Sequence, residues 1–176
     1  MLAKLAYSCC GLLVVVAISN STARAQEAAD WKKFESKEFK FSVEFPQSEV
    51  FEDETENAKH FFTSLPDTDT DFRIGVSNVA AVPQDRKEAI ETMNMIRDSV
   101  AESFEAKVEN PKEIEAKGNA GIEFTLLVDF DGDELAMTCR YFIIEDRLYQ
   151  VMVVRMNSMD LTKETKRFFD SFEIAK

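Results

Sequence analysis

The stretch GIEFTLLVDFDGDELAMTCRYFIIEDRLYQVMVVRM, residues 121–156, decides the fold of this chain. It contains three long alternating or apolar runs, separated by Asp131-Gly132 and by Glu145-Asp146. An Asp-Gly pair between two alternating runs is a strong signal for a β-hairpin, because glycine adopts positive φ without steric cost. The stretch therefore predicts three consecutive antiparallel strands. The last of them, Arg147 to Met156, is apolar at both parities, which indicates a central strand buried on both faces.

The N-terminal half continues the two-residue period. In the run from Phe39 to Phe45 four large apolar residues alternate with polar ones, and Trp31 to Glu35 supplies a partner strand for a hairpin. The acidic segment 47–57 is expected to be irregular. Further strands are expected at 59–65, from residue 72 to about 82, and at 112–116.

Two segments have helical periodicity instead. The first is expected from near Asp85 to near Lys107, with Asp85 and Glu88 spaced as in a capping box and Asn110-Pro111 closing the connection that follows. The second runs from Leu161 to Phe172 after a cap at Ser158 or Asp160. Two helices and about eight strands predict an α+β fold, in which helices flank an antiparallel β-sheet. We find no linker or repeat, so residues 26–176 are expected to form a single domain.

Residues 1–25 have the features of a cleavable export signal. Lys4 supplies the positive region, GLLVVVAI at 11–18 is the apolar region, and Ala23-Arg24-Ala25 is the small-x-small cleavage pattern. The mature protein would begin at Gln26 in a periplasm or outside the cell.

Two alternatives to cleavage are a membrane anchor and a lipid-modified cysteine. A membrane anchor needs about 20 apolar residues, whereas this run is interrupted by Ser8 and ends at Ser19-Asn20. A lipid-modified cysteine should follow the apolar region, but Cys9 and Cys10 precede it, so a lipoprotein is disfavoured.

Charge narrows the class of partner. The chain has 21 Lys and Arg residues, two of which (Lys4 and Arg24) leave with the signal, against 33 Asp and Glu residues, so the mature chain has a formal net charge of −14. Phosphate backbones and anionic lipid surfaces are bound through Lys and Arg. We therefore expect no nucleic acid partner and no stable membrane insertion once the signal is removed, and favour another exported or envelope protein as the partner.

Three segments resemble the PsbP-like proteins, namely Phe39 to Pro46 (FKFSVEFP), Arg147 to Val151 (RLYQV) and Phe168 to Phe172 (FFDSF). This superfamily includes the PsbP subunit of photosystem II and many exported bacterial proteins of unknown function. The resemblance implies an α/β/α sandwich and a docking or assembly role. No active site comes with it, and no photosystem docking segment is recognisable.

Acidic residues raise the question of calcium. Asp67, Asp69 and Asp71 alternate like the first ligands of an EF-hand loop, but Phe72 and Asn78 stand where such a loop needs Gly and Glu. These three aspartates are weak calcium candidates, and a solvated turn explains them as well.

Catalytic and cofactor motifs are absent from the sequence. After signal removal one histidine, His60, and one cysteine, Cys139, remain, whereas zinc sites need three or four such ligands. Cys139 shares strand parity with apolar residues and is expected to be a core residue. The glycine spacings match no nucleotide-binding loop. No metal or other cofactor is expected.

Three residues are weak candidates for ligand binding, namely Arg140, Tyr149 and Arg155. Either arginine would hold a carboxylate ligand in a pocket, or would have a structural role. The structural role, which is the favoured interpretation, is to end a buried face or to pair with Glu123 or Asp129 across the sheet. The sequence thus predicts an exported, non-catalytic accessory or protein-binding domain. The alternative is a small-ligand binding protein or an enzyme with a pocket between sheet and helix.

Overall fold

The computed structural model describes residues 30–47, 49–65, 68–130 and 132–174. The predicted signal, the cleavage site and Asp131 of the predicted Asp-Gly turn therefore lie outside the described residues.

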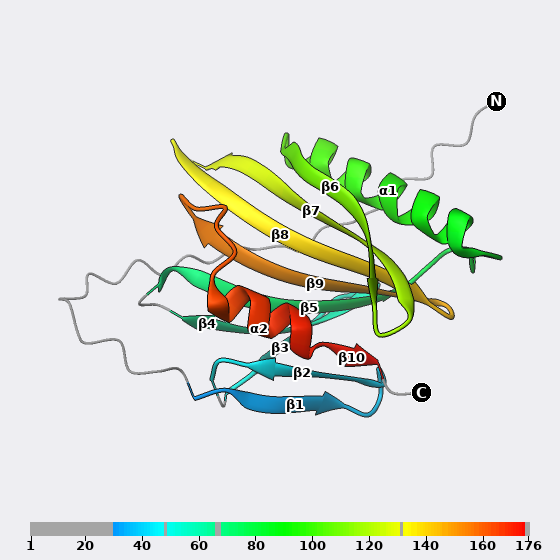
Figure 1. Ribbon diagram of the computed structural model, residues 1–176, viewed down its shortest axis with the longest axis horizontal. Helices are drawn as coiled ribbons and strands as arrows, with labels where there is room; N and C mark the ends of the chain where they lie inside the picture. The colour runs from blue at the N-terminus through cyan, green and yellow to red at the C-terminus, as the bar shows by residue number, and fades with distance from the viewer. Residues whose placement is uncertain (1–29, 48, 66–67, 131, 175–176) are drawn as a thin grey trace.

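Within those residues the strands form two antiparallel sheets (Figure 1). The small sheet has the order β1-β2-β10, and the large sheet has the order β3-β4-β5-β9-β8-β7-β6. The small sheet contains β1 (Lys32–Ser36), β2 (Phe41–Phe45) and β10 (Glu173–Ile174). The large sheet contains β3 (Phe51–Glu54), β4 (Ala58–Leu65), β5 (Thr70–Asn78), β6 (Lys107–Ala116), β7 (Asn119–Phe130), β8 (Asp133–Ile144) and β9 (Arg147–Met156).

The predicted α/β/α sandwich is wrong. In the described part of the chain there are two helices, α1 (Arg86–Ser103) and α2 (Lys163–Ser171), and the structure is mostly β. Helix α1 packs on β6, β7 and β8, but the opposite face of the large sheet is covered by the small sheet with α2 beside β2. The physical reason is that the hairpin β1–β2 pairs with the C-terminal strand β10, so its apolar face covers the large sheet as a second sheet.

Two apolar clusters, one on each face of the large sheet, form the core. The first joins β2, β4, β5, β9 and α2, and Phe168 connects the layers through ring contacts of 5.4 Å to Phe45 and 5.2 Å to Phe72. The second joins α1 to β7, β8 and β9 and contains Met93 and Cys139, so the prediction that Cys139 is a core residue is confirmed. Strand β9 lies between β5 and β8, which confirms its prediction as a central strand.

Local signals set the helix boundaries. Asp85 caps α1 by accepting a 2.9 Å hydrogen bond from Glu88 N, as predicted, although the Glu88 carboxylate returns to Gln84 N. Helix α1 ends at Ser103, not near Lys107, because the chain turns through Glu105 (φ 52°) directly into β6. Helix α2 is capped by Thr162, not by Ser158 or Asp160. No described helix is long and apolar enough to cross a membrane.

Candidate functional site

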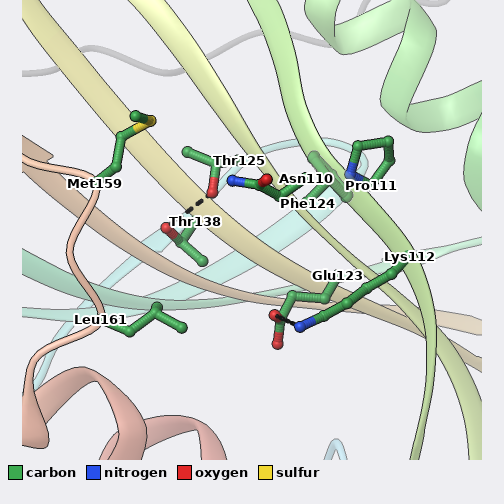
Figure 2. Close-up of a pocket in the computed structure, with 9 residues that line it drawn as sticks. All are labelled: Asn110, Pro111, Lys112, Glu123, Phe124, Thr125, Thr138, Met159 and Leu161. Carbon is green, nitrogen blue, oxygen red and sulfur yellow. Dashed lines mark hydrogen bonds and ion pairs between the residues drawn. The ribbon is translucent and has the colours of Figure 1, made fainter.

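A groove of about 490 Å³ opens on the large sheet where β6, β7 and β8 lie beside the loop that joins β9 to α2 (Figure 2). We call it the bulge groove. Its lining residues are Asn110, Pro111, Lys112, Glu123, Phe124, Thr125, Thr138, Met159 and Leu161.

The floor of the groove is polar because side chains alternate between the two faces of a strand. On β7, Ile122, Phe124 and Leu126 belong to the cluster under α1, so Glu123 and Thr125 project from the other face. Thr125 stands opposite Thr138 of β8, and their hydroxyl oxygens are 3.2 Å apart in a buried hydrogen bond. The floor of the groove is therefore a polar, hydrogen-bonded part of the sheet surface.

One wall of the groove is a β-bulge in β6. The register with β7 shifts between Glu109 and Lys112, and Asn110 adopts φ 51°. Pro111 has no N–H to donate to a ladder, which accounts for the interruption at this point of the strand. The prediction that Asn110-Pro111 closes a connection is wrong, because β6 begins at Lys107 and continues through both residues.

The opposite wall is the loop after β9, which exposes Met159 and Leu161 (Figure 2). Two hydrogen bonds hold the loop to the sheet. Arg155 Nη1 donates a 2.8 Å hydrogen bond to the carbonyl of Asp160, and the backbone N–H of Asn157 donates a 2.7 Å hydrogen bond to the carbonyl of Glu134. Two apolar side chains thus face solvent beside a polar floor.

Glu123 forms the charged centre of the groove. Lys112 Nζ lies 2.7 Å from one of its carboxylate oxygens and Arg140 Nε lies 2.7 Å from the other. Burial by itself raises the pKa of the Glu123 carboxyl. The hydrogen bonds from Lys112 and Arg140 and their positive charges lower it by more than burial raises it, so the pKa of Glu123 lies below the usual 4.5. Glu123 is therefore an ionised, almost buried carboxylate.

Arg140 connects this carboxylate to α2. Its guanidinium lies 4.6 Å from the centre of the Phe169 ring, and Nη1 lies 3.5 Å from Asp170. The favoured interpretation of Arg140 was pairing with Glu123 or Asp129 across the sheet, and the structure has the pair with Glu123.

The three predicted ligand candidates do not converge. Tyr149 is buried and its hydroxyl donates a 2.9 Å hydrogen bond to the carbonyl of Phe39. It lines a second depression of about 470 Å³, formed with Lys40, Lys117, Asn119, Ile144, Glu145, Arg147, Glu173 and Ile174. Arg140 and Arg155 line neither depression. Each of the three side chains makes contacts that hold the fold together.

The structure gives the described calcium candidates, Asp69 and Asp71, different environments. Asp67 lies outside the described residues. Asp69 occupies the turn before β5 with φ 44°, and Asp71 on β5 accepts hydrogen bonds from Ser64 Oγ at 2.5 Å and Arg73 Nη2 at 2.7 Å. Among the residues that the structure describes, no group of three His, Cys, Asp or Glu side chains could hold a metal ion.

His60 and Cys139 each have a structural environment. His60 packs over Gly75, and burial lowers the pKa of its imidazole, with Asp53 opposing that shift and Arg73 adding to it. Burial raises the pKa of the Cys139 thiol, and its Sγ lies 3.6 Å from the carbonyl of Met137. A protonated thiol in the core is a poor nucleophile.

A second exposed feature lies at the edge of the large sheet formed by β3. Phe51 is 51% exposed, its ring lies 5.8 Å from that of Phe62 on β4, and the Arg73 guanidinium of β5 lies 5.3 Å from the Phe62 ring. We call Phe51, Phe62 and Arg73 the Phe51 surface. They share one face because each is the register partner of the next.

Most of these residues could not be predicted from the sequence. Nothing in the sequence marked Lys112, Thr125 and Thr138 as residues of a binding site, since charged and hydroxyl residues are common on solvated strands. Pro111 could have indicated a bulge, because proline inside a strand pattern is confined to edges and bulges. Phe51 was hidden in a segment expected to be irregular.

No protein-family model matches this chain. No curated protein matches it either. A crystal structure from Bacteroides thetaiotaomicron VPI-5482 is similar with a TM-score of 0.55 and 17% identity, over 82% of this chain and 48% of that one. This chain therefore spans about half the length of that protein, and the likeness concerns the fold alone. A Pseudomonas aeruginosa protein of unknown function aligns with 11% identity and a TM-score of 0.41, over 74% of this chain and 85% of that one.

Proposed function

We propose that this chain is an exported, non-catalytic accessory domain that binds another protein of the cell envelope or exterior. The observation that carries the proposal is the Phe51 surface, where the exposed Phe51 of the outer strand β3 lies beside Phe62 of β4, and Phe62 lies beside Arg73 of β5. Aromatic residues and arginine are the types enriched in protein interfaces. Relation to the PsbP-like proteins stays a prediction from the sequence motifs.

Strand β3 suits a contact surface better than the other edge of the large sheet. Within the described residues, β3 and β6 are the outermost strands of that sheet. Strand β6 is interrupted by its bulge and by Pro111, devices that protect an edge from pairing. Strand β3 is regular over its four residues and leaves one backbone edge without a described partner strand.

The test is site-specific photo-crosslinking in the exporting cell. A photoreactive amino acid replaces Phe51 in one variant and Met95, exposed on α1, in a control variant. We expect one exported protein to be crosslinked from position 51 and not from position 95, and the variant Phe51→Ser to reduce co-purification of that protein while Met95→Ser does not. The same crosslinks from both positions, or none from position 51, would contradict the proposal.

Small-ligand binding is the second candidate function. The bulge groove supports it, because its volume lies within the range of about 300–1,000 Å³ found for ligand sites. A thermal-shift screen of small polar and amphipathic compounds tests this candidate. A compound that stabilises the wild type but not Thr125→Val would support it, since Thr125 is on the groove floor.

A further inference from the structure

The two cations that hold Glu123 are not equivalent. The Arg140 side chain is 20% exposed, lies on the neighbouring strand and is fixed by Phe169 and Asp170. The Lys112 side chain is 57% exposed and reaches Glu123 from the outer strand β6, directly after the bulge. Lys112 can leave and regain its hydration, whereas Arg140 cannot leave without disturbing α2.

The Glu123 carboxylate needs a second cation when Lys112 leaves. Its side chain is 8% exposed, so water replaces a lost partner poorly, and an unpaired buried charge is costly. An ammonium group from another molecule restores the same hydrogen bond. Exchange of one ammonium for another is therefore far less costly than an empty position.

The remaining groove residues suit an ammonium on a short aliphatic stem. Thr125, Thr138 and Asn110 line the same groove and carry oxygen atoms that can accept hydrogen bonds (Figure 2). Pro111, Met159 and Leu161 supply apolar surface against which methylene groups can pack, as the stems of lysine side chains do.

The overall charge favours the same ligand. The whole chain has a formal net charge of −12, and such a field attracts cations and repels anions during diffusional encounter. A carboxylate ligand would meet this field and also the fixed charge of Glu123 on the groove floor.

We propose that the bulge groove binds an aliphatic ammonium group, which replaces the Lys112 ammonium on the Glu123 carboxylate. Lys112 is then an internal competitor that occupies the position until the ligand arrives. The ammonium belongs either to a free alkylamine or to a lysine side chain of a partner. This inference goes beyond the protein-binding role and holds whether or not the Phe51 surface is an interface.

The experiment is an NMR titration of the ¹⁵N-labelled protein, as recovered from the cell, with pentylammonium chloride and, separately, sodium pentanoate at constant ionic strength. We expect pentylammonium to shift the amides of Lys112, Glu123, Thr125 and Leu161 in a saturable way. The variant Lys112→Gln should bind it about fivefold more tightly, the size of effect expected when a partly exposed ion pair no longer competes. The control Lys107→Gln, on the same strand but outside the groove, should bind like the wild type.

Three results would overturn the proposal. One is saturable binding of pentanoate at these amides that is lost in Lys112→Gln, which would make Lys112 the anchor of an anion site. Another is the absence of pentylammonium binding in Lys112→Gln. The third is unchanged pentylammonium binding in a folded Glu123→Gln variant. Because that variant removes a buried charge and can fail to fold, the Lys112→Gln titration is the deciding measurement.

A last titration separates the two sources of the ammonium. Nα-acetyl-lysine N-methylamide presents the lysine side chain with peptide groups on both sides. Tighter binding of this compound than of pentylammonium supports the proposal with a partner's lysine as the source, and tighter binding of pentylammonium supports it with a free amine.

Discussion

Glu123 and Arg140 stand opposite each other on β7 and β8, and Arg140 Nε donates a 2.7 Å hydrogen bond to Glu123 Oε2. The pair connects the floor of the bulge groove to α2, since the same guanidinium stacks on Phe169. The charge on Glu123 is maintained inside the sheet by this bond and by Lys112. Stability and ligand binding therefore depend on one carboxylate.

Removing Arg140 should destabilise the fold markedly. The variant Arg140→Met leaves Glu123 almost buried with Lys112 as its remaining cation, and we expect it to lower the free energy of unfolding by about 2–3 kcal/mol, because breaking a buried pair costs more than the pair contributes. Urea denaturation measures the change.

The control for this variant is Lys107→Met, which removes an exposed partner of Glu109 on β6 and should change stability by about 0.5 kcal/mol or less. Equal losses in the two variants would show that Arg140 has no special structural role.

The ionisation of Glu123 should be visible in the pH dependence of stability. Its folded-state pKa lies below the usual 4.5. The stabilisation from the ionised form is therefore fully present above pH 4.5 and is lost as the pH falls through the folded-state pKa. Denaturation of wild type and Glu123→Gln across this range measures it. We expect a constant difference in stability above pH 5 that shrinks on further acidification, whereas a difference independent of pH would contradict the assignment.

Gly121 on β7 should tolerate no side chain. A Cβ at this position would lie 2.5 Å from the carbonyl oxygen of Tyr141 and 2.6 Å from ring atoms of Phe142. We expect Gly121→Ala to cost about 1–3 kcal/mol through overpacking. Thermal denaturation compares it with Gly75→Ala, where the nearest atoms are side-chain ends of Gln150 and His60 that can move, and which should cost less. A larger loss at Gly75 would contradict this.

Export should remove residues 1–25. Intact-mass spectrometry of the protein recovered from the exporting cell is expected to give a chain that begins at Gln26, because Ala23 and Ala25 form the small-x-small pattern. The variant Ala25→Arg should accumulate uncleaved. A product with another N-terminus, or normal cleavage of the variant, would contradict the assigned site.

Local patterns predicted much of the secondary structure. The alternation in 39–45, the apolar run of β9 and the pair Asp85 and Glu88 each describe a relation between residues close in the chain, and the structure has a strand, a central strand and a helix cap there. The boundary errors at Ser103 and Thr162 are of the same local kind, because a turn through positive φ or an alternative cap differs little in sequence.

The candidate site was only partly predictable. Pairing of Arg140 with a carboxylate of the neighbouring strand was predicted, with Glu123 and Asp129 as the two possible partners, and the structure has Glu123. The groove could not be predicted, because it joins a bulge in β6 to a loop after β9, and no periodicity relates residues near 110 to residues near 160.

By itself the sequence determined most of the strands, the approximate helix positions, the central place of β9 and the burial of Cys139, since these depend on side-chain period and hydrophobicity. It did not predict the short strands β3 and β10. Only the tertiary structure decided that β10 pairs with β2 and that a second sheet, not a helix layer, covers one face. The physical reason is that strand pairing between segments over 120 residues apart depends on which apolar faces meet in the folded chain, and local pattern leaves that choice open.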